Sequence, residues 1–431
     1  MFHVIICPMP FVADLHIHSK YSRATSREMS PESLWKWAQL KGISVIATGD
    51  ITHPAWLTEL AGKLEPAGNG LFMLRDLYAT GDVPSSCRSE VFFMLSGEIS
   101  CIYKKNGRTR KIHALVLMPD IVSVERLNAS LEKIGNIRSD GRPILGLDAK
   151  KLLSLALDAS PDALFIPAHA WTPHFSVFGA ESGFDSLEEC FEELTPHIHA
   201  IETGLSSDPA MNWRLSALDG ITLVSNSDAH SAAKIGREAN ILDTDRTYAG
   251  ISRAIRTGGG FAGTYEFFPE EGKYHTDGHR ACKVSLTPKE TIRHNYRCPV
   301  CGGKLTVGVL HRVEKLADRD EGQRPQRAQA FQSLIPLPEL IAESLKAGVN
   351  TKKVDRQYHA LLEQLGQEFF ILTKADPGDI EAASSPVIAE AVNRMRQGRV
   401  HIDPGYDGEY GTISIFENDE REALQTTLSL R

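Results

Sequence analysis

Short, mainly apolar runs alternate with amphipathic stretches from about residue 11 to residue 256 of the chain. The runs at 45–48, 92–95, 163–167 and 221–225 have the length and the continuous apolar character of buried β-strands. Residues 30–42 and 184–194 instead show helical spacing of apolar positions, and the first stretch has Ser30 as an N-cap, Pro31 behind it and Gly42 as a stop. Strands that alternate with helices predict an α/β fold.

Metal-ligand side chains follow most of these strand-like runs. Ligands so far apart in sequence can converge only where the strands are neighbours, as at one edge of a parallel sheet or barrel. His16 and His18 lie two residues apart and share one face, as do Asp228 and His230. Nitrogen and oxygen ligands without thiolates suit zinc, manganese or iron, so the pattern predicts a site for several ions. The full set is Asp14, His16, His18, Asp50, His53, Glu98, His113, His169, Glu202, Asp228 and His230.

A glycine-rich run at 257–263 ends the alternation, and a different unit follows it. Cys298 and Cys301 are separated by two residues and followed by two glycines, which is typical of the tight knuckle of a zinc ribbon. A second pair with the same spacing lies upstream. We therefore predict one structural zinc ion bound by His279, Cys282, Cys298 and Cys301. The alternatives to His279 as fourth ligand are His275 and His294.

The remaining part of the chain is predicted to be mainly helical. Residues 319–332 are polar and linker-like, and helical periodicity follows at 336–348, 354–373 and 385–398. Residues 398–416 indicate two strands around a Pro-Gly and Asp-Gly turn region. The predicted domains are a metal-dependent catalytic barrel at 1–262, a zinc-binding module at 263–320 and a mainly helical C-terminal domain at 321–431.

Composition excludes several classes of protein. With 42% hydrophobic and 24% charged residues over 431 positions, the chain matches ordinary globular proteins, and its length suggests about three domains. No apolar run approaches the roughly 20 residues of a membrane span, so no membrane partner is expected. The apolar first eleven residues lack the features of a signal peptide. The cysteines are seven, an odd number, which favours a reduced, cytoplasmic protein over a disulfide-bonded one.

Charge is distributed unevenly along the chain. The formal net charge is −8, yet between positions 280 and 315 eight Lys and Arg oppose two Glu, a local net of +6 that leaves −14 elsewhere. A basic zinc module beside an acidic ligand-bearing domain suggests a clamp on a phosphate backbone next to a hydrolytic centre. The residues expected to contact the DNA backbone are Arg280, Lys283, Arg297, Lys304 and Arg312.

The ligand motifs resemble those of the PHP (polymerase and histidinol phosphatase) superfamily. The pair His16 and His18 is similar to its first motif, Glu98 to its bridging glutamate, and Asp228-x-His230 to its last motif. The resemblance implies a distorted (β/α)7 barrel that holds two to three divalent ions, with zinc, manganese, iron or magnesium as candidates. It implies one ion bound by His16, His18, Glu98 and Asp228, and a second bound by Glu98, His113 and His169.

The resemblance also implies a third ion near His230, and here the chain departs from the family pattern. The family usually has Thr-Asp-His at the corresponding strand end, whereas this chain has Asp50 after Thr48-Gly49 and His53 three residues later. Asp50 is favoured over His53 as the ligand. The residues that the resemblance implies to be catalytic are Glu98, Asp228 and His230.

A narrower resemblance covers most of the chain. The strings at 169–191, 202–216, 271–282, 298–319 and 404–411 resemble the endonuclease Q family. That resemblance implies a DNA repair endonuclease that hydrolyses the phosphodiester bond on the 5′ side of a deaminated base (uracil, hypoxanthine or xanthine) or of an abasic site, with damaged DNA as its partner.

A nuclease of this kind has to read a base edge that is hidden inside a base pair, so we expect the nucleotide to be flipped into a pocket. The loops after His169 and Glu202 leave the barrel on the ligand side. The residues expected to bind the flipped base are Trp171, Phe178, Ser207 and Asn212. The alternative is that these side chains pack beneath long loops.

Two other functions are compatible with parts of the sequence. A small-molecule phosphoesterase would need only the barrel, and it leaves the zinc module and the C-terminal domain without a role. A non-catalytic DNA-binding protein would use the barrel metals structurally, but the complete motifs at 16–18 and 228–230 argue against it.

Overall fold

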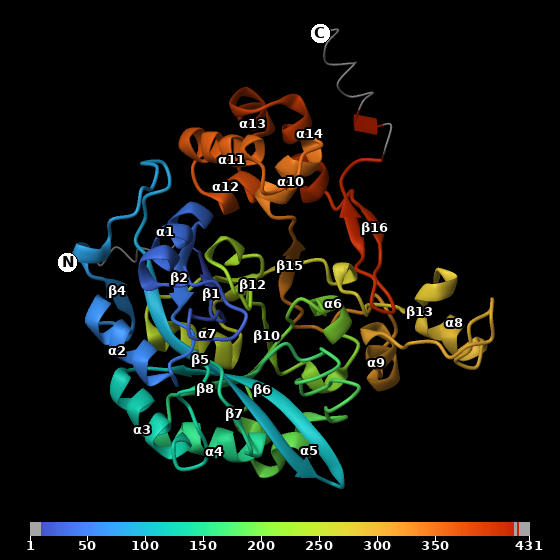
Figure 1. Cartoon of the computed structure of the whole chain (residues 1–431), viewed down its shortest axis with the longest axis horizontal. Helices are drawn as coiled ribbons and strands as arrows, with labels where there is room; N and C mark the ends of the chain where they lie inside the picture. The colour runs from blue at the N-terminus through green and yellow to red at the C-terminus, as the bar shows by residue number, and fades with distance from the viewer. Residues whose placement is uncertain (1–9, 418–419, 422–431) are drawn as a thin grey trace.

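The structure is a computed structural model that describes residues 10–417 and 420–421. A mixed sheet of eleven strands forms the centre of the N-terminal part (Figure 1). Its strands are β1 (Phe11–Asp14), β2 (Ile43–Ala47), β3 (Leu64–Pro66), β4 (Phe72–Leu74), β5 (Phe92–Lys105), β6 (Arg108–Met118), β7 (Ile144–Leu145), β8 (Leu164–Pro167), β11 (Ala239–Leu242), β12 (Phe261–Glu266) and β15 (Ala330–Ser333). Residues 1–9, the segment in which no signal peptide is expected, lie outside the described residues.

The sheet curves into the expected distorted barrel. The neighbours β1, β2 and β5 are parallel, and a separate parallel pair, β9 (Ala200–Glu202) with β10 (Thr222–Val224), fills the space between β8 and β11. The ring continues from β8 to β9 through the bond from Ala170 N–H to the Glu202 carbonyl. It continues from β10 to β11 through the bond from Ser225 N–H to Asn240 Oδ1.

Not all strands are parallel, which the sequence interpretation did not anticipate. β5 and β6 form a long antiparallel hairpin, and β6 also pairs antiparallel with β8. The cause is local: Asn106 and Gly107 both adopt left-handed backbone conformations (φ 52° and 72°), as a two-residue hairpin turn requires. The Asn-Gly dipeptide is a sequence signal for such a turn.

Alternate residues of the strands point to two apolar clusters. Met94 on β5 and Leu115 on β6 belong to the interior cluster, which also includes Ile251 and Ile255 of α7 (Tyr248–Thr257). The opposite faces pack on the outer helices. These are α1 (Pro31–Lys41), α2 (Pro54–Lys63), α3 (Ile121–Leu131), α4 (Ala149–Ala159), α5 (Leu187–Phe191) and α6 (Pro209–Asn212).

Helix α1 confirms the capping pattern read from the sequence. Ser30 caps it by accepting a bond from Ser33 N–H, Pro31 occupies the first turn, and Gly42 ends it in a left-handed conformation (φ 89°). The second predicted helix is shorter than expected. α5 ends at Phe191 and continues as a 3-10 helix over Glu192–His197, which contains Pro196.

Two further units follow the barrel (Figure 1). The first holds β13 (Asp277–His279), β14 (Val284–Leu286), α8 (Pro288–Arg293) and α9 (Val309–Leu316). The second holds α10 (Leu337–Ser344), α11 (Lys352–Leu365), α12 (Glu368–Thr373), α13 (Pro377–Ala383) and α14 (Pro386–Arg396). The expected terminal strands are the antiparallel pair β16 (His401–Asp403) and β17 (Thr412–Ser414).

Strand pairing and a buried ion pair join the C-terminal part to the barrel. β15 lies in the segment interpreted as a linker, and it pairs in parallel with β12, which itself crosses the predicted boundary at residue 262. In addition, Lys41 of α1 and Glu368 of α12 form a buried ion pair of 2.8 Å, and Tyr358 OH donates to the same carboxylate. Unpaired β12 backbone groups explain why a polar segment is recruited as a strand.

Candidate metal centre

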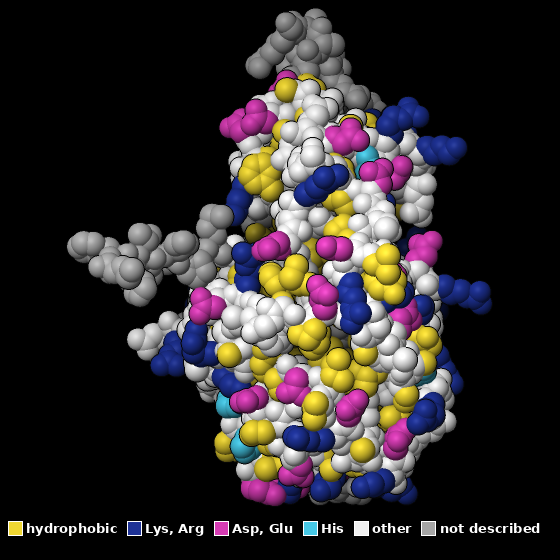
Figure 2. Space-filling view, turned by 90° about the vertical axis from the view of Figure 1, so that its left-hand side faces the viewer, with side chains coloured by type: hydrophobic (Ala, Val, Ile, Leu, Met, Phe, Trp, Pro, Cys, Tyr) yellow, Lys and Arg dark blue, Asp and Glu magenta, His cyan; other side chains and the backbone are white. Residues whose placement is uncertain are grey.

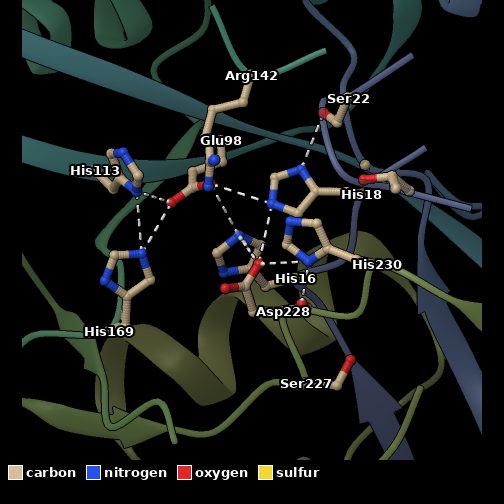
Figure 3. A network of polar contacts seen from close by, with 12 residues as sticks. His16, His18, Ser22, Glu98, His113, Arg142, His169, Ser227, Asp228 and His230 are labelled. Atoms are coloured by element: carbon tan, nitrogen blue, oxygen red, sulfur yellow. Dashed lines mark hydrogen bonds and ion pairs between the residues drawn. The ribbon is translucent and has the colours of Figure 1, made fainter. Parts of the chain in front are cut away.

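Glu98 lies between two groups of potential metal ligands (Figure 3). Its Oε2 is 3.2 Å from His18 Nε2 and 3.6 Å from His16 Nε2, and both histidine nitrogens face Asp228 Oδ1, at 3.0 and 3.7 Å. Its Oε1 is 2.7 Å from His113 Nδ1 and 3.1 Å from His169 Nε2. One carboxylate therefore serves both groups, with one oxygen for each.

Strand pairing explains how these residues meet. Glu98 on β5 and His113 on β6 are on the same face as Met94 and Leu115, and His113 lies opposite Ser100, two residues from Glu98. β8 pairs with β6, so the turn after β8 carries His169 to the same place. The side chains thus converge at the barrel interior, as the strand-end pattern predicted.

The buried atoms of the first group have the signature of a site that fits a cation. His16 Nε2, His18 Nε2 and Asp228 Oδ1 are buried and lack a hydrogen-bond partner. An unsatisfied buried polar atom costs about 1–3 kcal/mol, and three of them around one point are rare without a compensating ligand. Imidazole nitrogens and carboxylate oxygens suit zinc, manganese or iron, so the donor set fits divalent metals.

The other ring nitrogens of these histidines contact a second layer of acceptors. His16 Nδ1 is 3.0 Å from both oxygens of Glu202, and His18 Nδ1 is 3.1 Å from Asp50 Oδ1. His169 Nδ1 is 3.1 Å from Thr172 Oγ1. Such partners hold the tautomer that turns Nε2 toward a metal.

Asp50 supports His18 in this structure, and a third ion near His230 stays a prediction. The Asp50 carboxylate faces His18 and accepts bonds from Ser19 N–H (2.7 Å) and Ser22 Oγ (2.9 Å), which leaves it behind the ligands. His53 caps α2 by accepting from Trp56 N–H. Among the described residues, the ligand groups include neither of these two side chains nor His230.

His230 lies beside the centre rather than in a ligand group. Its ring is 4.5 Å from the ring of His18, and its Nδ1 is 2.8 Å from the Asp228 carbonyl. Burial lowers its pKa, and the neighbouring His18 adds to this effect. Asp14 accepts bonds from Ser227 and Gly236 N–H, so it supports the turn that carries Asp228.

Three residues of the centre have strained backbones. Asp50 (φ 50°), His169 (φ 30°) and Asp228 (φ 47°) adopt left-handed conformations without being glycine. Such conformations cost on the order of 1–3 kcal/mol each and cluster at functional sites. All three follow a strand. The side chains of His169 and Asp228 belong to the ligand groups, whereas that of Asp50 contacts His18 from behind.

The histidines of the two groups differ in their electrostatics. Burial opposes charge on His16 and His18, but the carboxylates of Glu202, Asp228 and Asp50 hold the pKa of these imidazoles well above the usual value. Burial opposes charge on Glu98, but His113 and His16 hold the pKa of its carboxyl well below the usual range. Burial lowers the pKa of His113 to about 4, so its imidazole is neutral at neutral pH, the form that ligates a metal.

Arg142 is a member of the centre that the sequence interpretation missed. Its Nη1 donates to Glu98 Oε2 at 3.0 Å (Figure 3). Its side chain remains 28% exposed. The loop that carries it is fixed: Gly141 N–H donates to the Tyr21 carbonyl, and a Cβ at Gly141 would collide with the Asp50 carboxylate. No spacing rule connects a loop arginine to strand-end ligands, which is why only the structure reveals it.

A second candidate metal site lies in the unit after the barrel. His279, Cys282, Cys298 and Cys301 form one group, with His279 Nδ1 at 3.7 Å from Cys301 Sγ, whereas His275 and His294 are not in it. Cys298 N–H donates to the Gly303 carbonyl and Gly302 N–H to that of Cys298, which forms the tight knuckle. Three thiolates and one imidazole fit a structural zinc ion.

Four of the five predicted DNA-backbone residues are exposed on this unit, namely Arg280, Lys283, Arg297 and Lys304. Arg312 differs. It is buried and donates to the Phe178 and Phe184 carbonyls and to Asp185, so it anchors α9 to the barrel. On the opposite side of the molecule, basic and acidic side chains are interspersed (Figure 2).

The four predicted base-binding residues form one buried network of contacts rather than an open surface. Trp171 Nε1 donates to Asn212 Oδ1 (2.8 Å), Asn212 Nδ2 donates to Ser207 Oγ (3.2 Å), and the Trp171 ring lies 5.0 Å from that of Phe178. These contacts join the loop after β8 to the loop after β9. Phe175 on the first loop is only half-buried, and its ring lies 4.6 Å from that of His113.

Comparisons with known proteins extend over nearly the whole chain. The lesion-specific endonuclease PfuEndoQ from Pyrococcus furiosus is 31% identical, with a TM-score of 0.83 over 97% of this chain and 99% of that one. A structure of endonuclease Q in complex with a 27-mer duplex substrate with an abasic lesion at the active site is also 31% identical. Its TM-score is 0.80, over 95% of this chain and 97% of that one.

Two sequence relatives are also similar. The uncharacterized protein YqxK of Bacillus subtilis is 31% identical over 417 residues, which are 93% of this chain and 98% of YqxK. The uncharacterized protein MJ0043 of Methanocaldococcus jannaschii is 32% identical over 255 residues, or 57% of this chain, and the match spans 31% of that longer protein. Residues 336–399, which hold α10–α14, match the family of the MJ0043 C-terminal domain.

Within the described part of the chain, no helix has the length and apolar character needed to cross a membrane.

Proposed function

The chain belongs to the endonuclease Q family, and from this premise we propose that it is a metal-dependent DNA repair endonuclease with its active site at Glu98. We propose hydrolysis of the phosphodiester bond on the 5′ side of a deaminated base (uracil, hypoxanthine or xanthine) or of an abasic site. Water adds across the bond between phosphorus and the 3′ oxygen. The products are then a 3′-hydroxyl and a 5′-phosphate.

The observation that carries this proposal is the position of Glu98 between two ligand groups. His16, His18 and Asp228 would hold one divalent ion with one Glu98 oxygen, and His113 and His169 would hold a second with the other. Two such ions activate water as a nucleophile and neutralise charge on a phosphate. His230 borders the first group, and with Glu98 and Asp228 it completes the proposed catalytic set.

Side chains around the two ligand groups are placed to position the substrate and the metal ligands. Arg142 reaches Glu98 from an anchored loop and is partly exposed, so it is placed to donate to a non-bridging oxygen of the scissile phosphate. Asp50 and Glu202 keep His18 and His16 in the required tautomers. The strained backbones at His169 and Asp228 hold both ligands in place before substrate binds.

The unit at 263–320 is proposed to hold one structural zinc ion and to bind the DNA backbone. Its exposed cations Arg280, Lys283, Arg297 and Lys304 lie on a segment of positive local charge. Neutralising phosphates in this way releases counterions and gives sequence-independent affinity. The barrel at 1–262 would perform the chemistry, and the domain at 321–431 would brace it through β15 and Glu368. The reduced cysteines Cys87, Cys101 and Cys190 favour a cytoplasmic location.

The deciding experiment gives metal-loaded protein three substrates: a duplex with one uracil, the same duplex with an abasic site, and p-nitrophenyl phosphate. Incision of the duplexes directly 5′ of the lesion is expected, with an undamaged duplex left intact. Glu98→Gln, which removes the shared carboxylate, serves as the inactive control. Turnover of p-nitrophenyl phosphate alone would instead indicate a small-molecule phosphoesterase, and binding without incision a non-catalytic DNA-binding protein.

A further inference from the structure

The segment from residue 280 to residue 304 presents a strongly positive surface. It contains six Lys and Arg, all exposed, and a single acidic residue, Glu290. The Glu290 carboxylate is engaged in the fold, because it accepts bonds of 2.8 Å from both the backbone N–H and the hydroxyl of Thr287 at the start of α8. The cations therefore dominate this surface.

Tyr296 is an exposed aromatic residue within this surface, with 44% of its area accessible. Asn295 and Tyr296 both have left-handed backbones, with φ of 52° and 60°. Their conformation is fixed, since Tyr296 N–H donates to the Thr291 carbonyl and Leu305 N–H donates to that of Tyr296, both at 3.0 Å. Backbone strain of this kind at an exposed tyrosine motivates a search for a function.

The buried carboxylate of Asp277 holds the Tyr296 side chain in its position through His311. Asp277, which has no exposed area, accepts from Gly308 N–H at 2.7 Å, and its other oxygen is 2.7 Å from His311 Nδ1. His311 Nε2 is 3.3 Å from Tyr296 OH. With Nδ1–H donated to the carboxylate, Nε2 accepts a hydrogen bond from the Tyr296 hydroxyl, so the bonds from Asp277 through His311 orient the ring.

The nearest cations lie on either side of the zinc knuckle. Arg297 follows Tyr296 directly and pairs with Lys304 in an isolated antiparallel bridge. Arg297 Nη1 also donates to the Gly302 carbonyl at 3.2 Å, which keeps the side chain against the knuckle. The aromatic ring therefore stands at the base of a loop whose two sides carry positive charge.

We propose that Tyr296 is the aromatic anchor of a DNA interface on this unit: its ring packs against a deoxyribose face of the duplex while Arg297 and Lys304 contact phosphates. The inference rests on the proposed function and deepens it, since it names a contact that is not ionic. An oriented ring contributes affinity that salt does not screen, whereas each phosphate contact contributes to the salt dependence.

The test measures binding of the full-length, metal-loaded protein to an undamaged duplex, by fluorescence anisotropy over a range of salt concentrations. Tyr296→Ala is expected to weaken binding on the order of tenfold at every salt concentration, with an unchanged slope of log affinity against log salt. Tyr296→Phe keeps the ring and is expected to lose much less. Arg297→Ala is expected to weaken binding and to reduce the slope by about one.

Controls separate the anchor from the fold. Tyr296→Asn suits the left-handed backbone and also removes the ring, so it should bind as weakly as Tyr296→Ala while zinc content stays at the wild-type level. Tyr410→Ala removes a more exposed tyrosine (75%) that lies beside acidic Glu409, and it should bind like the wild type.

The outcomes distinguish the anchor from the proposed function. If Arg297→Ala behaves as expected but Tyr296→Ala binds normally, the anchor is wrong and the basic interface stands. The anchor is also wrong if Tyr296→Ala lowers the salt slope or the zinc content, or if Tyr410→Ala weakens binding equally. Normal binding by both Tyr296→Ala and Arg297→Ala overturns the anchor and the DNA-binding role of the unit together.

Discussion

Ile17 lies opposite Ala229 in an isolated parallel bridge, in which His18 N–H donates to the Ala229 carbonyl at 3.0 Å. His16 and His18 flank the first residue, and Asp228 and His230 flank the second. The contacts agree with this pairing: His16 Nε2 and His18 Nε2 lie 3.7 and 3.0 Å from Asp228 Oδ1, and the ring of His18 lies 4.5 Å from that of His230. A single pairing therefore brings the first and the last ligand motifs of the barrel together, although they are more than two hundred residues apart.

Replacing Asp228 is expected to abolish incision while leaving DNA binding largely intact. Asp228→Ala removes a carboxylate that faces His16 and His18, whereas the exposed cations on the zinc unit remain. Losing several kcal/mol of transition-state stabilisation corresponds to a rate reduction of about a thousandfold or more. Single-turnover incision at saturating metal tests the rate, and anisotropy tests binding. Near wild-type rates would remove Asp228 from the catalytic set.

Asp50 and His53 are expected to differ in their effect on metal binding. Asp50→Asn removes the carboxylate that orients His18, which should lower metal affinity by about 10- to 100-fold without changing the number of ions bound at saturation. His53→Asn keeps a capping side chain on α2 and should bind metal like the wild type. Competition with a chelator measures both. Loss of one ion at saturation in Asp50→Asn would instead identify Asp50 as a ligand.

Arg142 is expected to act on substrate rather than on metal content. Arg142→Gln should lower kcat/KM by about a hundredfold, because it removes a charged donor from the phosphate, and the metal content of the purified protein should not change. Arg23→Gln is the matched control, since Arg23 pairs with Asp140 on the same loop but is mostly exposed to solvent. If both variants lose activity equally, the position of the loop determines activity, and a contact of the Arg142 guanidinium with the phosphate is excluded.

Cys298 is expected to be required for zinc and, through it, for DNA binding. Cys298→Ser should release one tightly held zinc ion and weaken binding of damaged and intact duplexes alike, because a metal-ordered unit of this size has little core of its own. Cys87→Ala changes a buried cysteine outside the cluster and should keep the ion. Metal analysis with unchanged zinc in Cys298→Ser would exclude this cluster as the zinc site.

Phe175 and Phe178 should separate lesion reading from loop packing. Phe175 is half-buried beside His113, so Phe175→Leu is expected to change the ratio of uracil to abasic-site incision. Phe178 packs on Trp171 in the core, so Phe178→Leu should lower both rates together and lower the melting temperature. Unchanged ratios in both variants would move lesion reading away from this loop.

Much of the fold and the convergence of the ligands follow from sequence, because they depend on periodicity and on strand ends, whereas the division into two groups was implied by the family resemblance. Ser30, Pro31 and Gly42 bound α1 as capping rules predict. The ligand positions follow because each side chain comes directly after, or within, an apolar strand.

Other features depend on tertiary contacts that spacing does not encode. Asp50 and Asp228 both follow a strand, and only the surrounding Ser19 and Ser22 determine that the first supports a histidine while the second faces the centre. Arg142 reaches Glu98 from a loop whose path is set by packing at Gly141. The antiparallel hairpin at Asn106-Gly107, by contrast, carried a readable signal.

The pairing of β15 with β12 makes the barrel dependent on residues that come long after its last ligand. A shortened chain that stopped at residue 320 would leave the β12 edge as an open row of amide and carbonyl groups, a surface that recruits strands from other molecules. It would also leave Lys41 as a buried cation without its partner Glu368. Fragments of this enzyme that contain every metal ligand but lack β15 should therefore self-associate. Evolution is then expected to keep the active site and β15 together in one protein.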